Sequence, residues 1–147
     1  MIKYDEICGI LKQKTPFVFV DRVLDMELGK RITAIKCISG GELFSALHFP
    51  KNSVYPGIFM IECIAQTASI LCTLSGEQSE MAEGEFLALG GIQRLQFMQP
   101  VRPGDTIRIE VEIIKQAQKL CLVKAQILVD MQIAAEGQLS FGVVKDG

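Results

Sequence analysis

One histidine and one glutamate stand close together in this sequence and could act as a base and an acid. His48 is the only histidine among the 147 residues, and Glu62 follows it fourteen positions later. A neutral imidazole is a competent base near neutral pH. A carboxyl group set among apolar side chains tends to keep its proton, which makes it a competent acid. The pair therefore indicates general acid–base chemistry.

A third candidate group lies between them, where Pro56-Gly57 opens a long apolar run. Proline suits the first turn of a helix. The first N–H groups of a helix lack intrahelical partners, and the helix dipole favours negative charge there. The Gly57 N–H is therefore a candidate donor to an oxyanion. A structural histidine and a glutamate at a polar gap or subunit interface fit the same residues, so spacing alone names no reaction.

Composition excludes several other kinds of site. The 15 basic and 17 acidic residues give a net charge of −2, which does not favour a general nucleic-acid surface. A single histidine excludes a histidine-rich metal site. The odd number of cysteines, with no C-x-x-C spacing, fits neither a zinc site nor a disulfide framework. These cysteines are Cys8, Cys37, Cys63, Cys72 and Cys121. We expect reduced thiols, no metal and a cytoplasmic protein.

Length and patterning predict one globular domain, residues 1–147, with a long central helix. The acidic start of the chain is unlike a signal peptide. Residues 2–13 predict a short helix, and residues 17–24 and 31–39 predict strands. An irregular segment, 43–54, precedes a helix from Pro56 to about Leu74 that stops at Gly76. This helix is apolar all round, so we expect burial on all sides, and Glu62 and Gln66 argue against a membrane span.

The second half of the sequence predicts antiparallel strands. An acidic loop, 77–85, leads to a strand over 86–97 with a kink at Gly90-Gly91. A turn at 102–105 follows, and then apolar and charged residues alternate over 107–113. Two more strands are predicted over 120–129 and 133–144, with a turn near Asp130. One helix and five or six largely antiparallel strands make an α+β domain.

Four segments of the chain resemble one family over nearly its whole length. Residues 48–71, HFPKNSVYPGIFMIECIAQTASIL, resemble the active-site stretch of the FabZ-type 3-hydroxyacyl-[acyl-carrier-protein] dehydratases. That pattern is H-F-P-G-x-P-x-x-P-G, with an acid five residues after the last glycine. The residues in register are His48, Phe49, Pro50, Pro56, Gly57 and Glu62. The segments PFVFVDRV, LGGIQRLQFMQPVRPGD and the terminal strands also match the family.

This resemblance implies a hot-dog fold, in which an antiparallel sheet wraps around the long helix. It also implies a homodimer, or a trimer of dimers, in which His48 meets Glu62 of the other subunit. The implied reaction removes water from a (3R)-3-hydroxyacyl thioester to give a trans-2-enoyl thioester in fatty-acid or related acyl-chain biosynthesis. His48 takes the C2 proton, Glu62 protonates the departing hydroxyl, and Gly57 stabilises the enolate-like oxygen.

The resemblance further implies an acyl carrier protein as partner. Its phosphopantetheine arm arrives with the substrate, so no resident cofactor is implied. We expect Phe49, Tyr55 and Phe59 to contact substrate, together with tunnel candidates Ile61, Leu89, Phe97 and Met98. A basic patch of Lys51, Arg94 and Arg102 is the predicted carrier-protein surface.

The sequence departs from the family pattern beside the predicted base. Leu47 and Lys51 replace glycines, Ser53 replaces a proline, and Tyr55 replaces a methionine. These changes leave the identity of the acyl substrate and its pathway undetermined. They also leave two alternatives open: a non-catalytic carrier-binding scaffold, or another hot-dog thioester enzyme such as a thioesterase or hydratase.

Overall fold

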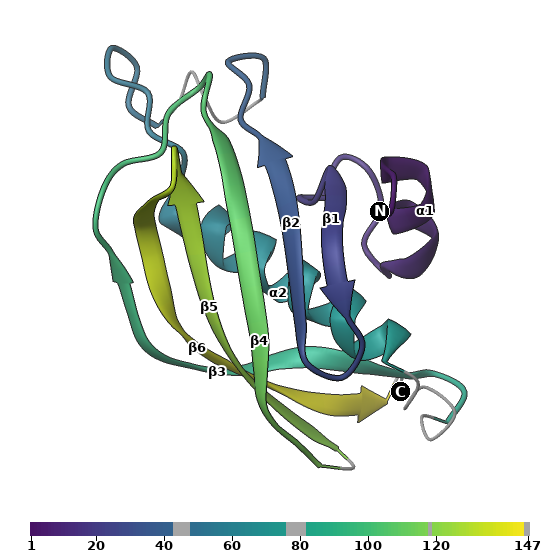
Figure 1. The fold of residues 1–147 in the computed structure, drawn as a ribbon. Coiled ribbons are helices and arrows are strands. Elements are labelled where there is room, and N and C mark those ends of the chain that lie inside the picture. The colour runs from purple at the N-terminus through teal and green to yellow at the C-terminus, as the bar shows by residue number, and fades with distance from the viewer. Residues whose placement is uncertain (43–47, 76–81, 118, 146–147) are drawn as a thin grey trace.

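The computed structural model describes residues 1–42, 48–75, 82–117 and 119–145 (Figure 1). These residues form a six-stranded antiparallel sheet that curves around one long helix, in the strand order β1-β2-β4-β5-β6-β3. The elements are α1 Tyr4–Ile10, β1 Arg22–Glu27, β2 Arg31–Cys37, α2 Gly57–Leu74, β3 Glu85–Phe97, β4 Thr106–Ala117, β5 Leu120–Val129 and β6 Gln132–Lys145. The predicted α+β arrangement and the β4-β5-β6 meander are confirmed.

Strand alternation decides which face of the sheet packs on α2. Ile107, Ile109 and Val111 of β4 are buried in the core shared with α2, while Glu110 and Glu112 between and after them point to the outer face. The alternation read from the sequence therefore identified the inner face correctly.

The predicted strand over 17–24 is wrong in its first half, because β1 begins only at Arg22. Val18, Phe19 and Val20 are buried, which explains their strand-like composition. The Phe19 N–H, however, donates to the Gln66 side chain at 2.7 Å, and the Phe17 carbonyl accepts from the same side chain at 2.9 Å. The side-chain amide of Gln66 thus bonds the backbone groups that a neighbouring strand would otherwise pair with. No local sequence pattern predicts this contact.

The expectation that α2 is buried on all sides is also wrong within the single chain. Ile58 is 69% exposed, and Phe59, Ile61 and Ala65 are half-buried. The sheet covers only one side of the helix (Figure 1). The helix is long and apolar enough to span a membrane, but 56% of it is buried in the fold, as in the core helix of a soluble protein. It ends at Leu74, and the predicted stop at Gly76 lies outside the described residues.

Residues 48–54 form the expected irregular loop, whereas 43–47, including Leu47, and most of the acidic loop lie outside the described part of the chain. Strand β3 has the expected irregularity between Leu89 and Gly91. A second, unpredicted one lies between Gln93 and Gln96. There Leu95 lies so close to β6 that a Cβ on Gly137 would sit 2.6 Å from its Cα, so only glycine fits at 137.

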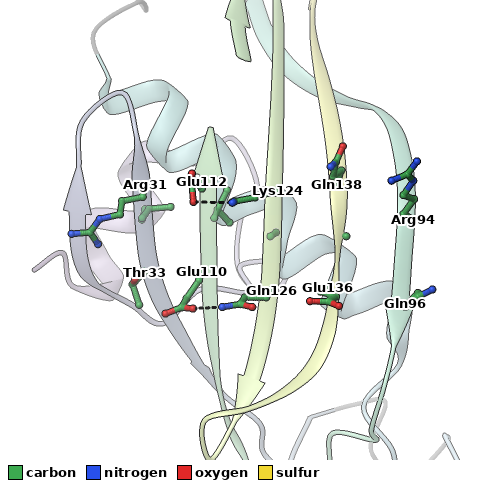
Figure 2. Close-up of a pocket in the computed structure, with 14 residues that line it drawn as sticks. Arg31, Thr33, Arg94, Gln96, Glu110, Glu112, Lys124, Gln126, Glu136 and Gln138 are labelled. Carbon is green, nitrogen blue, oxygen red and sulfur yellow. Dashed lines mark hydrogen bonds and ion pairs between the residues drawn. The ribbon is translucent and has the colours of Figure 1, made fainter. Parts of the chain in front are cut away.

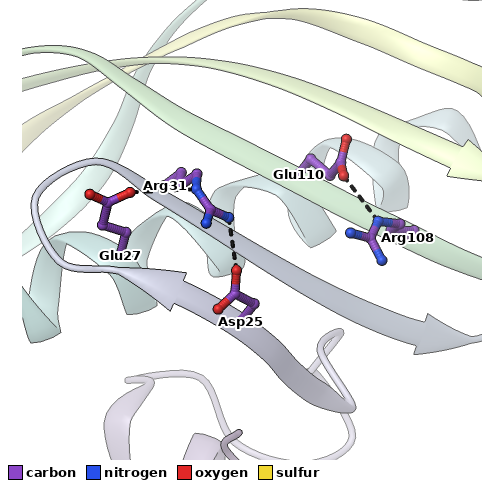
Figure 3. Close-up of polar contacts among 5 residues, drawn as sticks. All are labelled: Asp25, Glu27, Arg31, Arg108 and Glu110. Atoms are coloured by element: carbon purple, nitrogen blue, oxygen red, sulfur yellow. Dashed lines mark hydrogen bonds and ion pairs between the residues drawn. The ribbon is translucent and has the colours of Figure 1, made fainter.

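Ion pairs cross the outer face of the sheet (Figure 3). Arg31 on β2 donates to Asp25 at 2.9 Å and lies 3.6 Å from Glu27. On β4, Glu110 accepts from Gln126 at 2.6 Å and from Arg108 at 3.0 Å. These two hydrogen bonds, Gln126 first, lower the pKa of Glu110.

We expect Glu110→Gln to lower the free energy of unfolding at pH 7 by about 0.2–1 kcal/mol, the range for exposed charged contacts. The pKa of Glu110 is lower in the folded state. Its contribution is therefore complete above the unfolded-state pKa and disappears as pH falls through the folded-state pKa. Urea titrations of wild type and variant should differ at pH 7, and the difference should shrink as the pH falls below the unfolded-state pKa of Glu110. A difference that persists unchanged at pH 3 contradicts this origin.

Candidate active site

Two hydrogen bonds join the ends of the loop from His48, the predicted base, to Val54. The Val54 N–H donates to the His48 carbonyl at 2.8 Å, and the His48 ring contacts the Val54 carbonyl through Nδ1, also at 2.8 Å. A carbonyl only accepts, so Nδ1 carries the proton and the neutral ring keeps its lone pair on Nε2. Among the described residues Nε2 has no hydrogen-bond partner. The loop therefore presents His48 in the tautomer that a base requires.

The neighbouring aromatic ring lies against this imidazole. The Phe49 and His48 ring centroids are 4.3 Å apart and their planes are tilted by 31°. Phe49 is itself largely exposed. It therefore limits the orientation of His48 from one side and leaves the other side of the ring to another group.

Glu62, on the second turn of α2, is held through one of its two carboxylate oxygens. Its Oε1 accepts from Gln66 at 3.0 Å and from Gln13 at 3.4 Å. Its Oε2 has no partner in the described part of the chain, so Oε2 is the oxygen left available to a further group.

Sequence reasoning missed Gln66 as a positioning residue. The side chain is fully buried, and it also bonds the backbone of residues 17 and 19 as described above. The signal was available, because a glutamine four residues after a glutamate lies on the same helix face. Its reach to residues 17 and 19 was not available from the sequence.

Gly57 begins α2, with Pro56 as its N-cap. The N–H groups of Phe59 and Met60 both donate to the Pro56 carbonyl, and the Gly57 N–H has no acceptor among the described residues. The ring of Phe97, at the end of β3, packs over this helix start. A Cβ on Gly57 would lie 3.0 Å from the Phe97 Cζ atom, so glycine is needed for this close approach.

Tyr55 lies inside the fold, only 5% exposed, and not on the surface of the loop. Its N–H donates to the Val101 carbonyl at 2.7 Å, and its hydroxyl is hydrogen-bonded to the Cys63 thiol. Burial raises the pKa of both groups, that of Cys63 to about 12. The Phe59 ring lies 5.8 Å from the Tyr55 ring and 5.4 Å from the Phe19 ring. Tyr55 and Phe59 thus belong to one packed aromatic cluster.

The three residues of the predicted basic patch do not lie together. Lys51 is exposed on the loop, and Arg102 donates to Asn52 and to the Ser53 carbonyl of that loop. Arg94 instead lines a polar hollow of about 750 Å³ on the outer face of the sheet (Figure 2). This hollow contains none of His48, Glu62 and Gly57.

Some of the charged groups that line this hollow have partners within it. Glu112 lies 3.4 Å from Lys124, and Glu110 accepts from Gln126. Across residues 1–42, 48–75, 82–117 and 119–145, no three His, Cys, Asp or Glu side chains gather as a metal site would need. His48 and Glu62 of one chain form no hydrogen bond or ion pair with each other within those ranges.

A family model described as a FabA-like domain matches residues 11–138, and the chain therefore belongs to this family. The chain is 38% identical over 146 residues to the "3-hydroxyacyl-[acyl-carrier-protein] dehydratase FabZ" of Acetivibrio thermocellus, covering 98% of this chain and 96% of that protein. It is 36% identical over 140 residues to the protein of the same name from Staphylococcus saprophyticus, covering 95% and 94%. The FabZ-type resemblance of the sequence is confirmed.

Solved structures support the hot-dog fold. The dehydratase heterocomplex ApeI:P from Xenorhabdus doucetiae superposes with a TM-score of 0.79 at 16% identity, over 96% of this chain and 91% of that one. A hypothetical thioesterase with coenzyme A from Streptococcus pneumoniae gives a TM-score of 0.64 at 10% identity, over 85% and 86%. At these identities the likeness concerns the fold alone.

We expect Gln66→Leu to destabilise the chain by about 1–3 kcal/mol, because it leaves the buried Phe19 N–H without its acceptor. Urea unfolding monitored by circular dichroism measures this. Thr67→Val is the matched control on the same buried stretch, since its hydroxyl only donates to the carbonyl of Cys63 four residues earlier. Equal costs for both variants would contradict the role given to Gln66.

We expect Gly57→Ala to reduce turnover of acyl thioesters, because the added methyl group displaces the Phe97 ring from the start of α2. Phe97→Leu in the same chain removes the ring and should restore part of the loss. Steady-state kinetics of the single and double variants test this. A double variant no better than Gly57→Ala would show that the clash is not the cause.

Proposed function

We propose that this chain, as one domain of residues 1–147, dehydrates (3R)-3-hydroxyacyl-[acyl-carrier-protein] to the trans-2-enoyl thioester in fatty-acid biosynthesis. Its relatives across nearly the whole chain are named for this activity. The observation that carries the assignment to residues is the His48 Nδ1 contact with the Val54 carbonyl, which leaves Nε2 as a base.

His48 Nε2 takes a proton from C2, which the neighbouring thioester acidifies. The electron pair forms the C2–C3 double bond as the C3–O bond breaks. Glu62 delivers a proton from Oε2 to the departing hydroxyl, which leaves as water. The Gly57 N–H and the start of α2 stabilise negative charge on the thioester oxygen between these events. The phosphopantetheine arm arrives with the carrier protein, and the protein supplies no resident cofactor.

We further propose a homodimer in the cytoplasm, which can assemble into a trimer of dimers. Three features support a second copy: the exposed Ile58 of α2, the half-buried side chains beside it, and exposed apolar residues along the edge strand β3. Within one chain His48 and Glu62 are not bonded to each other, which fits a site completed by Glu62 of the other subunit. Phe49, Phe59, Phe97 and Met98 then border the acyl chain.

The carrier protein docks beside the loop from His48 to Val54 in this proposal. Lys51 is exposed there and has no ion-pair partner among the described residues. Arg102 borders the same loop, whereas Arg94 lies apart from it, in the hollow on the outer face of the sheet. An acidic carrier protein is attracted to such a surface even though the net charge of the chain is −2.

Conversion of a 3-hydroxyacyl thioester, followed by the absorbance of the conjugated enoyl product, tests the reaction. We expect wild type to turn over and His48→Ala and Glu62→Gln each to lose at least about 10²-fold in kcat. Glu6→Gln, a carboxylate on α1 far along the chain from the site, serves as control. Activity that survives in both site variants would overturn the assignment of acid and base.

Mixing the two inactive variants tests whether a site combines two subunits. If His48 and Glu62 of one site come from different chains, a mixed dimer has one intact site and one doubly altered site. Refolding the variants together should then restore about a quarter of wild-type activity, the statistical value for random pairing of two chains. No recovery in a mixture shown to contain mixed dimers would place both residues of a site on one chain.

A further inference from the structure

We infer that Arg102 is a positioning residue that holds the His48 loop in its catalytic form, and that this, not carrier-protein docking, is its main contribution. The inference rests on the proposed function and assigns a task to a residue outside the acid, base and oxyanion donor. It starts from one side-chain atom, the Arg102 Nη1 nitrogen.

This nitrogen donates to two acceptors on the loop. It lies 2.6 Å from the Asn52 Oδ1 atom and 3.2 Å from the Ser53 carbonyl oxygen. Hydrogen bonds from a charged donor are shorter and stronger than those between neutral groups. Arg102 therefore fixes a side chain and the adjacent backbone of the loop together.

The residue after this contact is the one that holds the base. Val54 follows Ser53 in the chain. Its N–H donates to the His48 backbone carbonyl, and its own carbonyl is hydrogen-bonded to the His48 ring. A shift of the Ser53 carbonyl moves Val54, and a shift of the Val54 carbonyl rotates the imidazole. Arg102 thus controls the orientation of His48 through two residues of backbone.

Arg102 is itself anchored to the sheet. Its N–H donates to the Asp105 carboxylate at 2.8 Å, and the Asp105 N–H donates back to its carbonyl at 3.0 Å. The turn that these bonds close is tied to the end of β2, where Ile38 exchanges backbone hydrogen bonds with Gly104 and Asp105, each of 2.9 Å. The guanidinium therefore connects the loop to a rigid part of the fold.

The composition of the loop explains why such a connection is needed. The segment Lys51-Asn52-Ser53 contains no proline, so its backbone dihedrals are not restricted by a ring. Ordering such residues costs conformational entropy, which contacts must offset. The charged hydrogen bonds from Arg102 are contacts of that kind.

Kinetics on two substrates separate positioning from docking. Arg102→Ala should reduce kcat by about ten- to hundredfold, and by the same factor on the carrier-protein thioester and on a small N-acetylcysteamine thioester. A docking residue would instead raise KM for the carrier-protein substrate and leave the small substrate unaffected. Arg108→Ala removes an arginine from the outer face of the sheet (Figure 3). This variant should leave kcat and KM for both substrates unchanged.

Variants of the acceptor test the contact itself. Asn52→Ala should reproduce most of the loss, and adding it to Arg102→Ala should cost little more, because both remove one interaction. Asn52→Asp should keep kcat on the small substrate, because a carboxylate still accepts from the guanidinium. Arg102→Lys should recover only part, since a lysine ammonium lacks the planar fork. Additive losses in the double variant would overturn the inference.

A measurement independent of turnover distinguishes failure of this inference from failure of the proposed function. Hydrogen exchange of the Val54 amide, which donates to His48, should be faster in Arg102→Ala than in wild type and unchanged in Arg108→Ala. If exchange is faster in Arg102→Ala but the wild type dehydrates neither substrate, only the proposed function is contradicted. Unchanged exchange in Arg102→Ala would overturn the positioning role.

Discussion

The side-chain amide of Gln66 links the fold to the chemistry. It is fully buried in α2, it satisfies backbone groups of residues 17 and 19, and it donates to Glu62, the proposed acid. A buried amide is costly unless its donors and acceptor are used, and here they are. The packing of the segment before β1 on α2 and the orientation of Glu62 therefore depend on the same side chain.

A second set of hydrogen bonds performs the same task for the base. Val54 holds His48 at both its backbone and its ring, and Arg102 holds the residues before Val54. The proposed acid thus lies on a helix and the proposed base on an irregular loop. On the loop, where the sequence departs from the family pattern, the Arg102 guanidinium from the turn after β3 contacts Asn52 and Ser53.

The outer surfaces of the chain divide into two kinds. The outer face of the sheet carries ion pairs, such as that between Glu112 and Lys124. The open side of α2 and the edge strand β3 carry apolar groups such as Ile58 and Ile92. Paired charges stabilise a solvated face, whereas contiguous apolar surface favours association. Glu62, whose Oε2 atom has no hydrogen-bond partner among the described residues, lies on α2 itself.

The sequence by itself determined the helix from Gly57, the meander from β4 to β6, and the candidate acid, base and oxyanion donor, because these follow from local periodicity, turn residues and motif spacing. Only the tertiary structure decided that Phe17 and Phe19 bond to Gln66, that one side of α2 is uncovered, and that Tyr55 lies inside the core. It alone joined Arg102 to Asn52, fifty residues away. Contacts between distant segments depend on how the sheet curves around the helix, and no local pattern contains that information.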